Sequence, residues 1–344
     1  MFGFLRSYFS SDMAIDLGTA NTLIIHNDEV VVNEPSIVAL NRNNMKEVLA
    51  VGKKALMMHE KTHESIRTVR PLKDGVIADF NAAELMIREL IKLVLTKKPL
   101  FAPKWRMMIC IPSSITEVEK RAVKDSAEHA GAREVYMVHE PIAAAIGIGI
   151  DIEQPNGSLV VDIGGGTTEV AIISLSGIVV ENSIRVAGDE FTRDIKDYLL
   201  REHKLVIGER SAEQIKIQVG SALPELENPP ADFEIRGRDQ MTGIPKEILI
   251  NYSEIAYALD SSITKIEVAI METLQRAPAE LSGDIFHNGI HLAGGGAMLH
   301  GLDKRIEKKT QLKVHVADDP LKAVIRGTGE ILKNLEKYRP VLIT

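Results

Sequence analysis

Hydrophobic and polar positions along this chain follow two different periods, one typical of strands and one typical of helices. Short apolar runs rich in β-branched residues predict buried strands at 13–17, 22–26, 106–111, 158–162 and 168–174. Apolar side chains recur at helical spacing over 82–96, 115–130 and 253–275. Because strands and helices mix throughout the chain, we expect an α/β fold.

Shorter motifs predict further elements and a peripheral lobe. Ser211 and Gln214 have the spacing of a capping box, which predicts that a helix begins just after Ser211. Residues 176–186 are expected to add another pair of strands. Residues 224–245 are rich in proline and charged side chains, which is typical of a lobe at the periphery of a domain.

One pattern of strand, aspartate, glycine turn, threonine and strand occurs twice. The chain reads MAIDLGTANTLII near its start and SLVVDIGGGTTEVAIIS near its middle. Gly164 follows Asp162 at the spacing at which Gly18 follows Asp16. A repeat separated by nearly half of the chain predicts two similar domains, each of which opens with this hairpin.

The physical chemistry of these turns indicates a bound phosphate. Glycine lets the backbone approach an anion closely, and successive N–H groups of such a turn form an anion-binding concavity. An aspartate beside each turn would repel a bare phosphate, so we expect a hard cation such as Mg²⁺ to lie with Asp16 and Asp162. One such turn alone would be interpreted as a tight hairpin, but a third glycine-rich loop at 294–296 favours the phosphate interpretation.

Composition and charge exclude several other classes of protein. The chain has 344 residues and a formal net charge of −7, which argues against a broad basic surface for nucleic acid. Its single cysteine, Cys110, lies in an apolar run and is interpreted as a core residue; it can form no disulfide within the chain. The histidines are scattered, no cysteine-based metal motif occurs, and neither GxxxxGKS, GxxxxGKT nor GxGxxG is present.

The first eleven residues, MFGFLRSYFSS, are unusually aromatic. On a helix, Phe2, Leu5 and Phe9 would form one apolar stripe with Phe4 beside it. This pattern predicts a short amphipathic helix that lies in a membrane interface. The alternative is a tail that packs on its own domain or on a neighbouring molecule.

A second apolar segment lies in the loop KKPLFAPKW, which contains two prolines. It is expected to expose Leu100 and Phe101, either as a second membrane contact or as a packing plug. No apolar stretch reaches the roughly 20 residues of a membrane-spanning helix.

These residues resemble the ATPase superfamily of actin, sugar kinases and heat-shock chaperones. The resemblance is much closer to the bacterial actin homologues of the MreB family, in blocks that follow one another across nearly the whole chain: IDLGTANTLI, VNEPSIVA, RPLKDGVIADF, EPIAAAIG, VVDIGGGTTEVAIIS, IGERSAEQIK, RGRDQMTGIP, AGGGAML and ADDPL. Two departures are modest. Ala293 precedes the glycine triplet where many relatives carry threonine, and His139 stands where an acidic residue is frequent.

The resemblance implies the residues of an ATP and Mg²⁺ site. Asp16 and Asp162 are implied to position the metal and its waters. Glu140 is implied to orient the attacking water, with the assistance of Thr167. The phosphate-holding turns are implied at Thr19, Ala20 and Asn21 and at Gly164, Gly165, Gly166 and Thr167.

The resemblance also implies contacts with the nucleoside. Gly294, Gly295, Gly296 and Ala297 match a loop that lies against it. Glu213 and Lys216 match positions near the ribose and the adenine, although their spacing alone would favour a surface ion pair. The aromatic N-terminal segment and the Leu100–Phe101 loop match two membrane contacts of MreB-like proteins.

The implied architecture is actin-like, with two related ATPase domains, each carrying a smaller peripheral subdomain, and with the nucleotide in the cleft between them. Domain I is expected at 1–144 and 326–344, with its peripheral subdomain at about 33–73. Domain II is expected at 145–325, with its peripheral subdomain at about 186–245.

The implied function is an ATP-dependent, membrane-associated filament that organises cell-wall synthesis and maintains rod cell shape. Its ATPase activity would be coupled to filament assembly and disassembly. The implied partners are further copies of the chain, the inner membrane surface and cell-wall elongation proteins, without nucleic acid. The implied location is cytoplasmic, peripheral on the inner face of the cell membrane.

Three alternatives remain open at this point. A small-molecule kinase of the same superfamily would need a catalytic base and a sugar pocket, and the sequence indicates neither. A chaperone-like ATPase switch would need a peptide-binding domain after the ATPase, and none is expected before Thr344. A scaffold that binds nucleotide without turnover is the third, because His139 adjoins Glu140.

Overall fold

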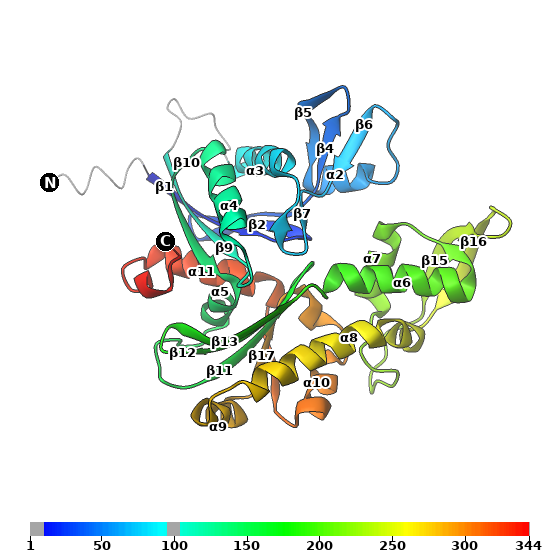
Figure 1. The fold of residues 1–344 in the computed structure, drawn as a ribbon. Helices are drawn as coiled ribbons and strands as arrows, with labels where there is room; N and C mark the ends of the chain where they lie inside the picture. Colours follow the sequence, from blue (N-terminus) through cyan, green and yellow to red (C-terminus); the bar gives the residue numbers. More distant parts are fainter. Residues whose placement is uncertain (1–9, 95–103, 344) are drawn as a thin grey trace. The chain divides into compact units, whose positions relative to one another are not determined.

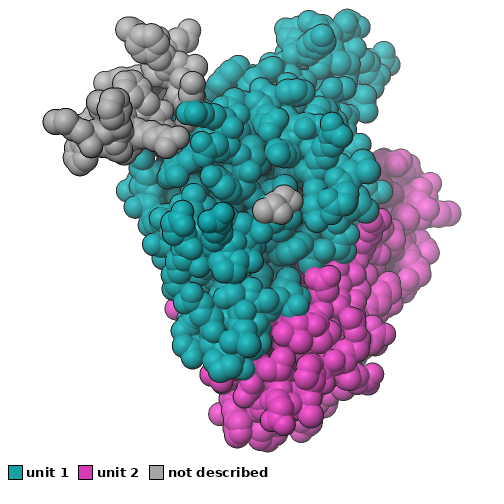
Figure 2. All heavy atoms as spheres, turned by 60° about the vertical axis from the view of Figure 1, so that its left-hand side comes forward, with its two compact units in different colours: residues 1–155, 174–178, 322–344 teal, residues 156–173, 179–321 magenta. Residues whose placement is uncertain are grey.

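The computed structural model describes residues 10–94 and 104–343, and this part of the chain forms two compact units (Figure 2). Unit 1 comprises residues 1–155, 174–178 and 322–344, and unit 2 comprises residues 156–173 and 179–321. Each unit is built around its own sheet and its own hydrophobic core.

Unit 1 is built on a mixed sheet of five strands, which are, in spatial order, β10 (Ala132–His139), β9 (Lys104–Ile111), β1 (Ser10–Leu17), β2 (Asn21–His26) and β3 (Glu29–Pro35) (Figure 1). β1 pairs antiparallel with β2 and parallel with β9. The predicted first hairpin is therefore present. Its pairing places Asp16 opposite Leu23 on one side and Cys110 on the other.

Helices cover both faces of this sheet. Side chains of α3 (Phe80–Val94) and α4 (Glu117–His129) share the core cluster of Ile15 and Ile109. α5 (Glu140–Gly147) and α11 (Ala323–Lys333) pack together, and α11 also contacts β1 and β9. Because strand side chains alternate between faces, this arrangement buries both sides of the two central strands.

α5 and α11 cross at a pair of glycines. A Cβ atom on Gly147 would lie 1.8 Å from the carbonyl oxygen of Ala323. A Cβ atom on Gly327 would likewise lie 1.8 Å from the carbonyl oxygen of Ala143. The two backbones therefore approach more closely than any residue with a side chain would allow.

The rest of unit 1 consists of small elements. A three-stranded sheet has the order β5-β4-β6, formed by β4 (Val38–Asn41), β5 (Asn44–Val51) and β6 (Ile66–Val69), beside helix α2 (Gly52–Met58). A two-stranded sheet is formed by β7 (Leu72–Lys73) and β8 (Val76–Ile77), and a short 3₁₀ helix, η3 (Arg339–Val341), lies near the C-terminus.

Unit 2 is built on a second mixed sheet of five strands, which are, in spatial order, β13 (Gly177–Ile184), β12 (Thr168–Ser174), β11 (Ser158–Ile163), β17 (Ile290–Ala293) and β18 (Val314–Val316). Its helices are α6 (Gly188–His203), α7 (Glu209–Val219), α8 (Tyr252–Gln275), α9 (Ala279–Asn288) and α10 (Leu302–Thr310). A peripheral three-stranded sheet is formed by β14 (Leu205–Val206), β15 (Phe233–Asp239) and β16 (Pro245–Ile250). Two 3₁₀ helices are η1 (Gly295–Met298) and η2 (Pro320–Lys322).

The two large sheets have the same topology. In each, three consecutive strands occupy one side, the first two of them antiparallel, and two later strands are added in parallel beside the first. The order β3-β2-β1-β9-β10 corresponds element by element to β13-β12-β11-β17-β18. This correspondence confirms that the repeated hairpin marks two similar domains.

Three local predictions were wrong. α7 begins at Glu209 with Gly208 as N-cap and no side-chain cap bond, so Ser211 lies inside the helix. A capping box is present instead on α4, between Thr116 and Glu119. Residues 177–184 form one strand instead of a pair, and Ser10 and Ser11, assigned to the aromatic N-terminal helix, belong to β1.

Candidate functional site

The turn between β1 and β2 is held through its carbonyl oxygens. The hydroxyl of Ser36 donates to the carbonyl of Gly18 at 2.6 Å, and the N–H of Ser36 donates to the carbonyl of Ala20 at 2.9 Å. The side chain of Ser36 is fully buried, and its oxygen also lies 2.9 Å from the hydroxyl of Thr22. Thr19 is fixed separately, because its hydroxyl accepts from the N–H of Gly75 at 3.0 Å.

This anchoring determines where the N–H groups of the turn point. In a planar trans peptide the C=O and the following N–H point in opposite directions. The carbonyl of Gly18 points to Ser36, so the N–H of Thr19 points away from it. Within the described residues, the N–H groups of Gly18, Thr19 and Ala20 donate to no backbone carbonyl.

The turn between β11 and β12 has the same construction. It is closed by a bond of 2.9 Å from the N–H of Gly164 to the carbonyl of Thr167. The carbonyl of Gly164 accepts from the N–H of Gly188 at 3.1 Å, and that of Gly165 accepts from Asp189 at 2.7 Å. Both donors lie at the start of α6. The N–H groups of Gly165 and Gly166 consequently point away from α6, and in the described part of the chain they meet no backbone acceptor.

Both predicted phosphate turns therefore have their carbonyls bound and their N–H groups directed outward. Successive N–H groups in this arrangement form an anion-binding concavity. The turn at 18–20 belongs to unit 1 and the turn at 164–167 to unit 2, and each has this property independently.

Asp16, at the end of β1, is a half-buried carboxylate with a thiol neighbour. Cys110 on β9 donates its Sγ–H to Oδ1 of Asp16 at 3.3 Å. Burial raises the pKa of Asp16 to about 6, and the thiol bond offsets part of this shift. Burial also raises the pKa of Cys110 well above its ordinary value, and the negative charges of Asp16 and Glu140 raise it further. Cys110 is thus a core residue, as expected, but it also contacts the predicted metal-site carboxylate.

Glu140 is the first residue of α5, directly after β10. Pro141 is the second residue of the helix, and His139 occupies the N-cap position without a side-chain cap bond. His139, the residue before Glu140, is paired with Ile111 of β9, and the preceding residue of β9, Cys110, is paired with Asp16, so α5 begins at the edge of the sheet where Asp16 lies. A carboxylate in the first turn of a helix is favoured by the helix dipole.

Asp162, the next-to-last residue of β11, lies beside the third glycine loop. It is 5% exposed and is paired in the sheet with Ala293, the last residue of β17. Gly294 has φ +79°, and a Cβ atom there would lie 2.4 Å from Oδ1 of Asp162 and 2.3 Å from the carbonyl of Ile163. A Cβ atom on Gly296 would lie 2.2 Å from Cγ2 of Ile163.

These contacts place the predicted loop against β11. Its last predicted residue, Ala297, is buried in η1. The loop therefore needs glycine at 294 to approach Asp162 so closely, and glycine at 296 to approach Ile163. On the opposite side of β11, Thr167 is also buried at the end of the phosphate turn.

Glu213 and Lys216, on α7, form an ion pair with a distance of 2.6 Å from Nζ to Oε2. The pair is not an isolated surface contact, because Nζ of Lys216 also donates to the carbonyl of Gly188 at 2.8 Å. Gly188 in turn holds the carbonyl of Gly164. Unit 2 thus brings the predicted nucleoside-contact residues next to its phosphate turn.

The predicted membrane residues Phe2, Phe4, Leu5, Phe9, Leu100 and Phe101 lie outside the described residues. Among the helices that the structure describes, none is both long and apolar enough to cross a membrane.

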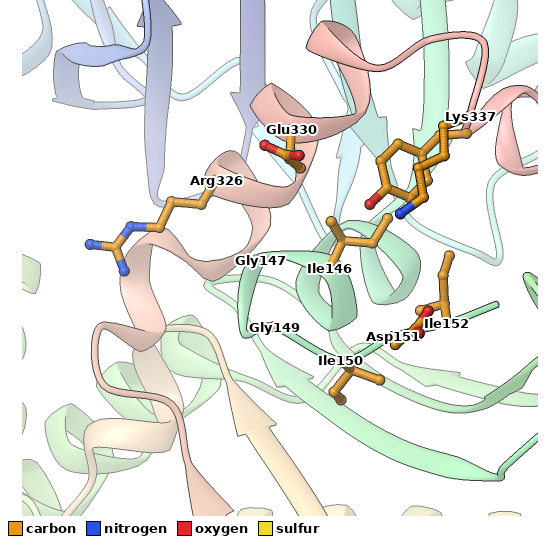
Figure 3. A pocket seen from close by; sticks show the side chains of 10 residues that line it. Ile146, Gly147, Gly149, Ile150, Asp151, Ile152, Arg326, Glu330 and Lys337 are labelled. Atoms are coloured by element: carbon orange, nitrogen blue, oxygen red, sulfur yellow. The ribbon is translucent and has the colours of Figure 1, made fainter. Parts of the chain in front are cut away.

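A surface cavity of about 440 Å³ lies in unit 1 between the loop after α5 and the C-terminal segment (Figure 3). Its lining includes Ile150, Asp151 and Lys337. Lys337 pairs with Glu153 at 3.3 Å and lies 4.9 Å from the ring centroid of Tyr338. None of the predicted nucleotide residues lines this cavity, so it is separate from the phosphate turns.

Sequence reasoning missed the residues that hold the turns. Ser36 carries only a weak signal, a small hydroxyl residue directly after Pro35. Thr192 of α6, which contacts both Glu213 and Lys216, carries no local signal. Gly188 and Asp189 donate through their backbone N–H groups, whose positions are set by where α6 begins, so their side chains give no signal in the sequence.

Comparison with protein families and curated proteins gives a consistent result. The family model described as MreB/Mbl protein matches residues 10–340. The chain is 47% identical over 330 residues to the cell shape-determining protein Mbl of Bacillus subtilis (strain 168), covering 96% of this chain and 98% of that protein. It is 45% identical over 337 residues to the cell shape-determining protein MreB of Escherichia coli (strain K12), covering 97% and 96%.

Solved structures agree. The crystal structure of MreB 5 of Spiroplasma citri bound to AMPPNP matches with a TM-score of 0.89 and 40% identity, over 96% of this chain and 98% of that one. The MamK double helical filament matches with a TM-score of 0.78 over 95% of this chain and 99% of that chain. At 21% identity the second match bears on the fold alone.

Proposed function

Because this chain belongs to the MreB/Mbl family of cell shape-determining proteins, we propose that it is an ATP-dependent, actin-like filament protein that acts at the inner face of the cell membrane. The actin-like α/β fold, which the resemblance implies, is confirmed by the match to MreB 5 of Spiroplasma citri. The domain limits expected from the sequence, 1–144 with 326–344 and 145–325, remain a proposal.

The observation that carries the proposal is the shared construction of the two phosphate turns. In each turn the carbonyl oxygens accept hydrogen bonds from residues elsewhere in the same unit, and the N–H groups point outward. We propose that both turns bind the phosphates of one adenine nucleotide. The AMPPNP bound by S. citri MreB 5 supports the choice of nucleotide.

The residues beside the turns suit a magnesium ion. Asp16 and Asp162 offer carboxylate oxygens, the ligands that Mg²⁺ prefers, and Mg²⁺ keeps several of its waters in such sites. Burial disfavours the charged form of Asp16, and a nearby cation would offset that cost. When bound, Mg²⁺ would neutralise charge on the phosphate oxygens.

Hydrolysis is assigned to Glu140 and Thr167. Glu140 is proposed to accept a hydrogen bond from the attacking water and so to orient it for in-line attack. Thr167, buried at the end of the turn, is proposed to assist in holding this water. The residues of the third loop, Gly294 to Ala297, are proposed to lie against the nucleoside.

Membership of the MreB/Mbl family supports the proposed filament and its proposed location. A head-to-tail contact between identical subunits continues as a filament when its rotation does not close a ring. We propose that nucleotide hydrolysis weakens the assembled state, and that the aromatic N-terminal segment binds the membrane surface. A single amphipathic segment binds weakly, whereas a filament presents many at once. Cell-wall elongation proteins are the proposed partners.

The catalytic assignment is tested with Glu140→Ala. The variant is expected to bind ATP with nearly unchanged affinity, because the phosphates are held by backbone N–H groups, and to release phosphate at least 100-fold more slowly, about the contribution of one positioned general base. Glu117→Ala is the matched control, since Glu117 is also the first residue of a helix in unit 1 and is exposed. Phosphate release by Glu140→Ala at the parental rate would refute the assignment. Failure of the parent protein to bind ATP in calorimetry would refute the nucleotide function itself.

Membrane binding is tested by deleting residues 2–9, which leaves β1 intact from Ser10. The shortened protein is expected to polymerise with ATP but to stay in the supernatant when liposomes are sedimented. Undiminished co-sedimentation would show that the N-terminal segment is not the membrane anchor. Polymerisation of the parent protein, observed by electron microscopy on a lipid monolayer, is the reference.

A further inference from the structure

Two histidines lie side by side where the large sheet of unit 2 ends. His291 on β17 is paired in register with His315 on β18, and the two strands run parallel. Their side chains therefore project from the same face of the sheet. Ile290 and Leu292, the neighbours of His291, project from the opposite face and are fully buried in the core of unit 2. The histidine pair is thus separate from this core.

The two imidazole rings have the spacing of a pair that shares one metal ion. Their centroids are 5.3 Å apart, and their planes differ by 27°. Zinc binds an imidazole nitrogen at about 2.0–2.1 Å, and tetrahedral angles then place the centroids of two such rings about 5.2 Å apart. The terminal torsion of a histidine side chain is soft, so rotation about it directs both nitrogens to a common point without moving the strands.

The ring nitrogens of both histidines are available to a ligand. Within residues 10–94 and 104–343, neither ring forms a hydrogen bond or an ion pair with another residue. His315 is exposed and His291 is half-buried, so ions in solution can reach the pair. Gly289 leaves room for the ring of His315, because a Cβ atom there would lie 3.1 Å from Cδ2 and Nε2 of that ring.

Glu307 of α10, an acidic residue beside β18, is already used by the protein. Its Oε1 accepts from the N–H of Val314 at 3.2 Å, and its Oε2 pairs with Lys304 at 3.0 Å. Among the described residues, no other histidine, cysteine or carboxylate forms a three-ligand group with the histidine pair. The protein ligands at this position are therefore the two imidazoles.

We propose that His291 and His315 bind one transition-metal cation of the Zn²⁺ type between their imidazole nitrogens, with water in the remaining coordination positions. Imidazole is a good ligand for Zn²⁺, Ni²⁺ and Cu²⁺, whereas Mg²⁺ and Ca²⁺ prefer oxygen ligands. The site therefore differs in chemistry from the magnesium site proposed at Asp16 and Asp162. It is independent of the proposed nucleotide function and goes beyond it.

The metal would join the two strands that lead to the third glycine loop. β17 ends at Ala293, directly before Gly294, and the chain after β18 reaches Pro320. The carbonyl of Pro320 accepts from the N–H of Gly294 at 3.0 Å, so the two segments meet there. Because the bound cation holds both strands in their folded pairing, it should raise the melting temperature of the protein.

The test is calorimetry on the full-length protein without nucleotide, with Zn²⁺, Ni²⁺ and Mg²⁺ in separate titrations. The parent is expected to bind Zn²⁺ and Ni²⁺ at this site, and Mg²⁺ should not compete for it. His315→Gln and His291→Gln each remove one imidazole and should weaken Zn²⁺ binding about tenfold or more, because the second contact of a chelate is intramolecular. His287→Gln is the matched control, since His287 is an exposed histidine of unit 2 whose ring lies beside Phe286.

Two further measurements identify the ligands. Zn²⁺ should raise the melting temperature of the parent and of His287→Gln, but not that of His315→Gln. Electron paramagnetic resonance of the Cu²⁺-loaded parent should show coupling to two imidazole nitrogens, and loss of one of them in His315→Gln. Circular dichroism checks that each variant is folded. His315 is exposed, so His315→Gln should fold like the parent and decides the matter alone if His291→Gln does not fold.

Equal Zn²⁺ affinity in the parent, His291→Gln and His315→Gln would overturn the inference, because the metal would then bind elsewhere. A Cu²⁺ spectrum of the parent with a single imidazole nitrogen would overturn it as well. The nucleotide function is judged separately by ATP binding. A parent that binds no ATP but loses its Zn²⁺ site in His315→Gln would refute the nucleotide function and support the metal site.

Discussion

Ser36 donates its hydroxyl to the carbonyl oxygen of Gly18 at 2.6 Å, and this bond orients the turn between β1 and β2, the predicted phosphate turn of unit 1. Ser36 itself is fully buried and lies 18 residues further along the chain. A fully buried side chain thereby determines where the turn directs its N–H groups.

Replacement of Ser36 by alanine is expected to weaken this turn. The carbonyl of Gly18 and the hydroxyl of Thr22 would each lose a buried partner, which lowers the free energy of unfolding by about 1–3 kcal/mol. ATP affinity should fall as well, because the turn is no longer held in its binding orientation. Urea denaturation and calorimetry measure the two effects. Ser282→Ala, which removes an exposed hydroxyl bonded to its own helix, should change neither.

Replacement of Gly294 by alanine tests the close approach of the third loop to Asp162. The new methyl group would meet the carbonyl of Ile163 at 2.3 Å in a backbone conformation that already disfavours side chains. We expect a loss of stability of more than about 3 kcal/mol and no detectable nucleotide binding. Gly243→Ala is the matched control, because Gly243 has φ +73° but open space around its Cβ position. Gly243→Ala should lower the free energy of unfolding only by the strain of a left-handed backbone, about 1–2 kcal/mol. Similar melting temperatures for the two variants would contradict the steric argument.

Alanine is expected to have opposite effects on the free energy of unfolding at two helical glycines, Gly327 at the crossing of α5 and α11 and Gly283 in α9. Gly327→Ala would place a methyl group 1.8 Å from the carbonyl of Ala143, and should lower the free energy of unfolding by about 3 kcal/mol. Gly283→Ala, in α9, meets nothing within 4 Å and should raise it by about 0.5–1 kcal/mol, as expected for alanine in a helix. Thermal denaturation followed by circular dichroism distinguishes the two. Stabilisation by Gly327→Ala would show that the helices can separate at little cost.

A pH dependence is expected from Asp194 of α6. Burial raises the pKa of this carboxyl above its ordinary value, although Ser262 donates a hydrogen bond to it. The folded protein therefore binds this proton more tightly than the unfolded chain, so the stabilising contribution is complete below the unfolded pKa of about 4 and is lost as pH rises through the raised folded value.

Asp194→Asn should accordingly stabilise the protein at pH 7, with a gain that vanishes when unfolding is measured near pH 4. Asp197→Asn, on an exposed face of the same helix, should have a smaller effect at both values. A gain for Asp194→Asn that is independent of pH would rule out ionisation as its cause.

The sequence predicted those features that depend on local requirements. The repeated hairpins were predictable because strand periodicity, a terminal aspartate and a glycine turn all lie within about fifteen neighbouring positions, a span within reach of pattern reasoning. Gly294 and Gly296 were likewise predictable as positions of close backbone approach, and the structure gives the atoms that require them. The shared topology of the two sheets follows from the same repeat.

The supporting contacts could not be predicted, because they join residues that are distant in the sequence. Cys110 reaches Asp16 across 94 positions, and Thr192 reaches Glu213 across 21. Local signals can also mislead. Ser211 and Gln214 have the same capping-box spacing as Thr116 and Glu119. Of the two hydroxyl residues, Thr116 caps its helix and Ser211 does not. α7 begins at Glu209, two residues before Ser211, so Ser211 cannot act as its N-cap.

The tethers of the two phosphate turns differ in how they can change during evolution. In unit 2 both donors are main-chain groups, and at position 189 any amino acid except proline would provide the same hydrogen bond. In unit 1 one donor is the hydroxyl of Ser36, which a single base change can remove. Substitutions that change nucleotide affinity within this family should therefore alter the turn of unit 1 more often than the turn of unit 2, whose tethers do not depend on particular side chains.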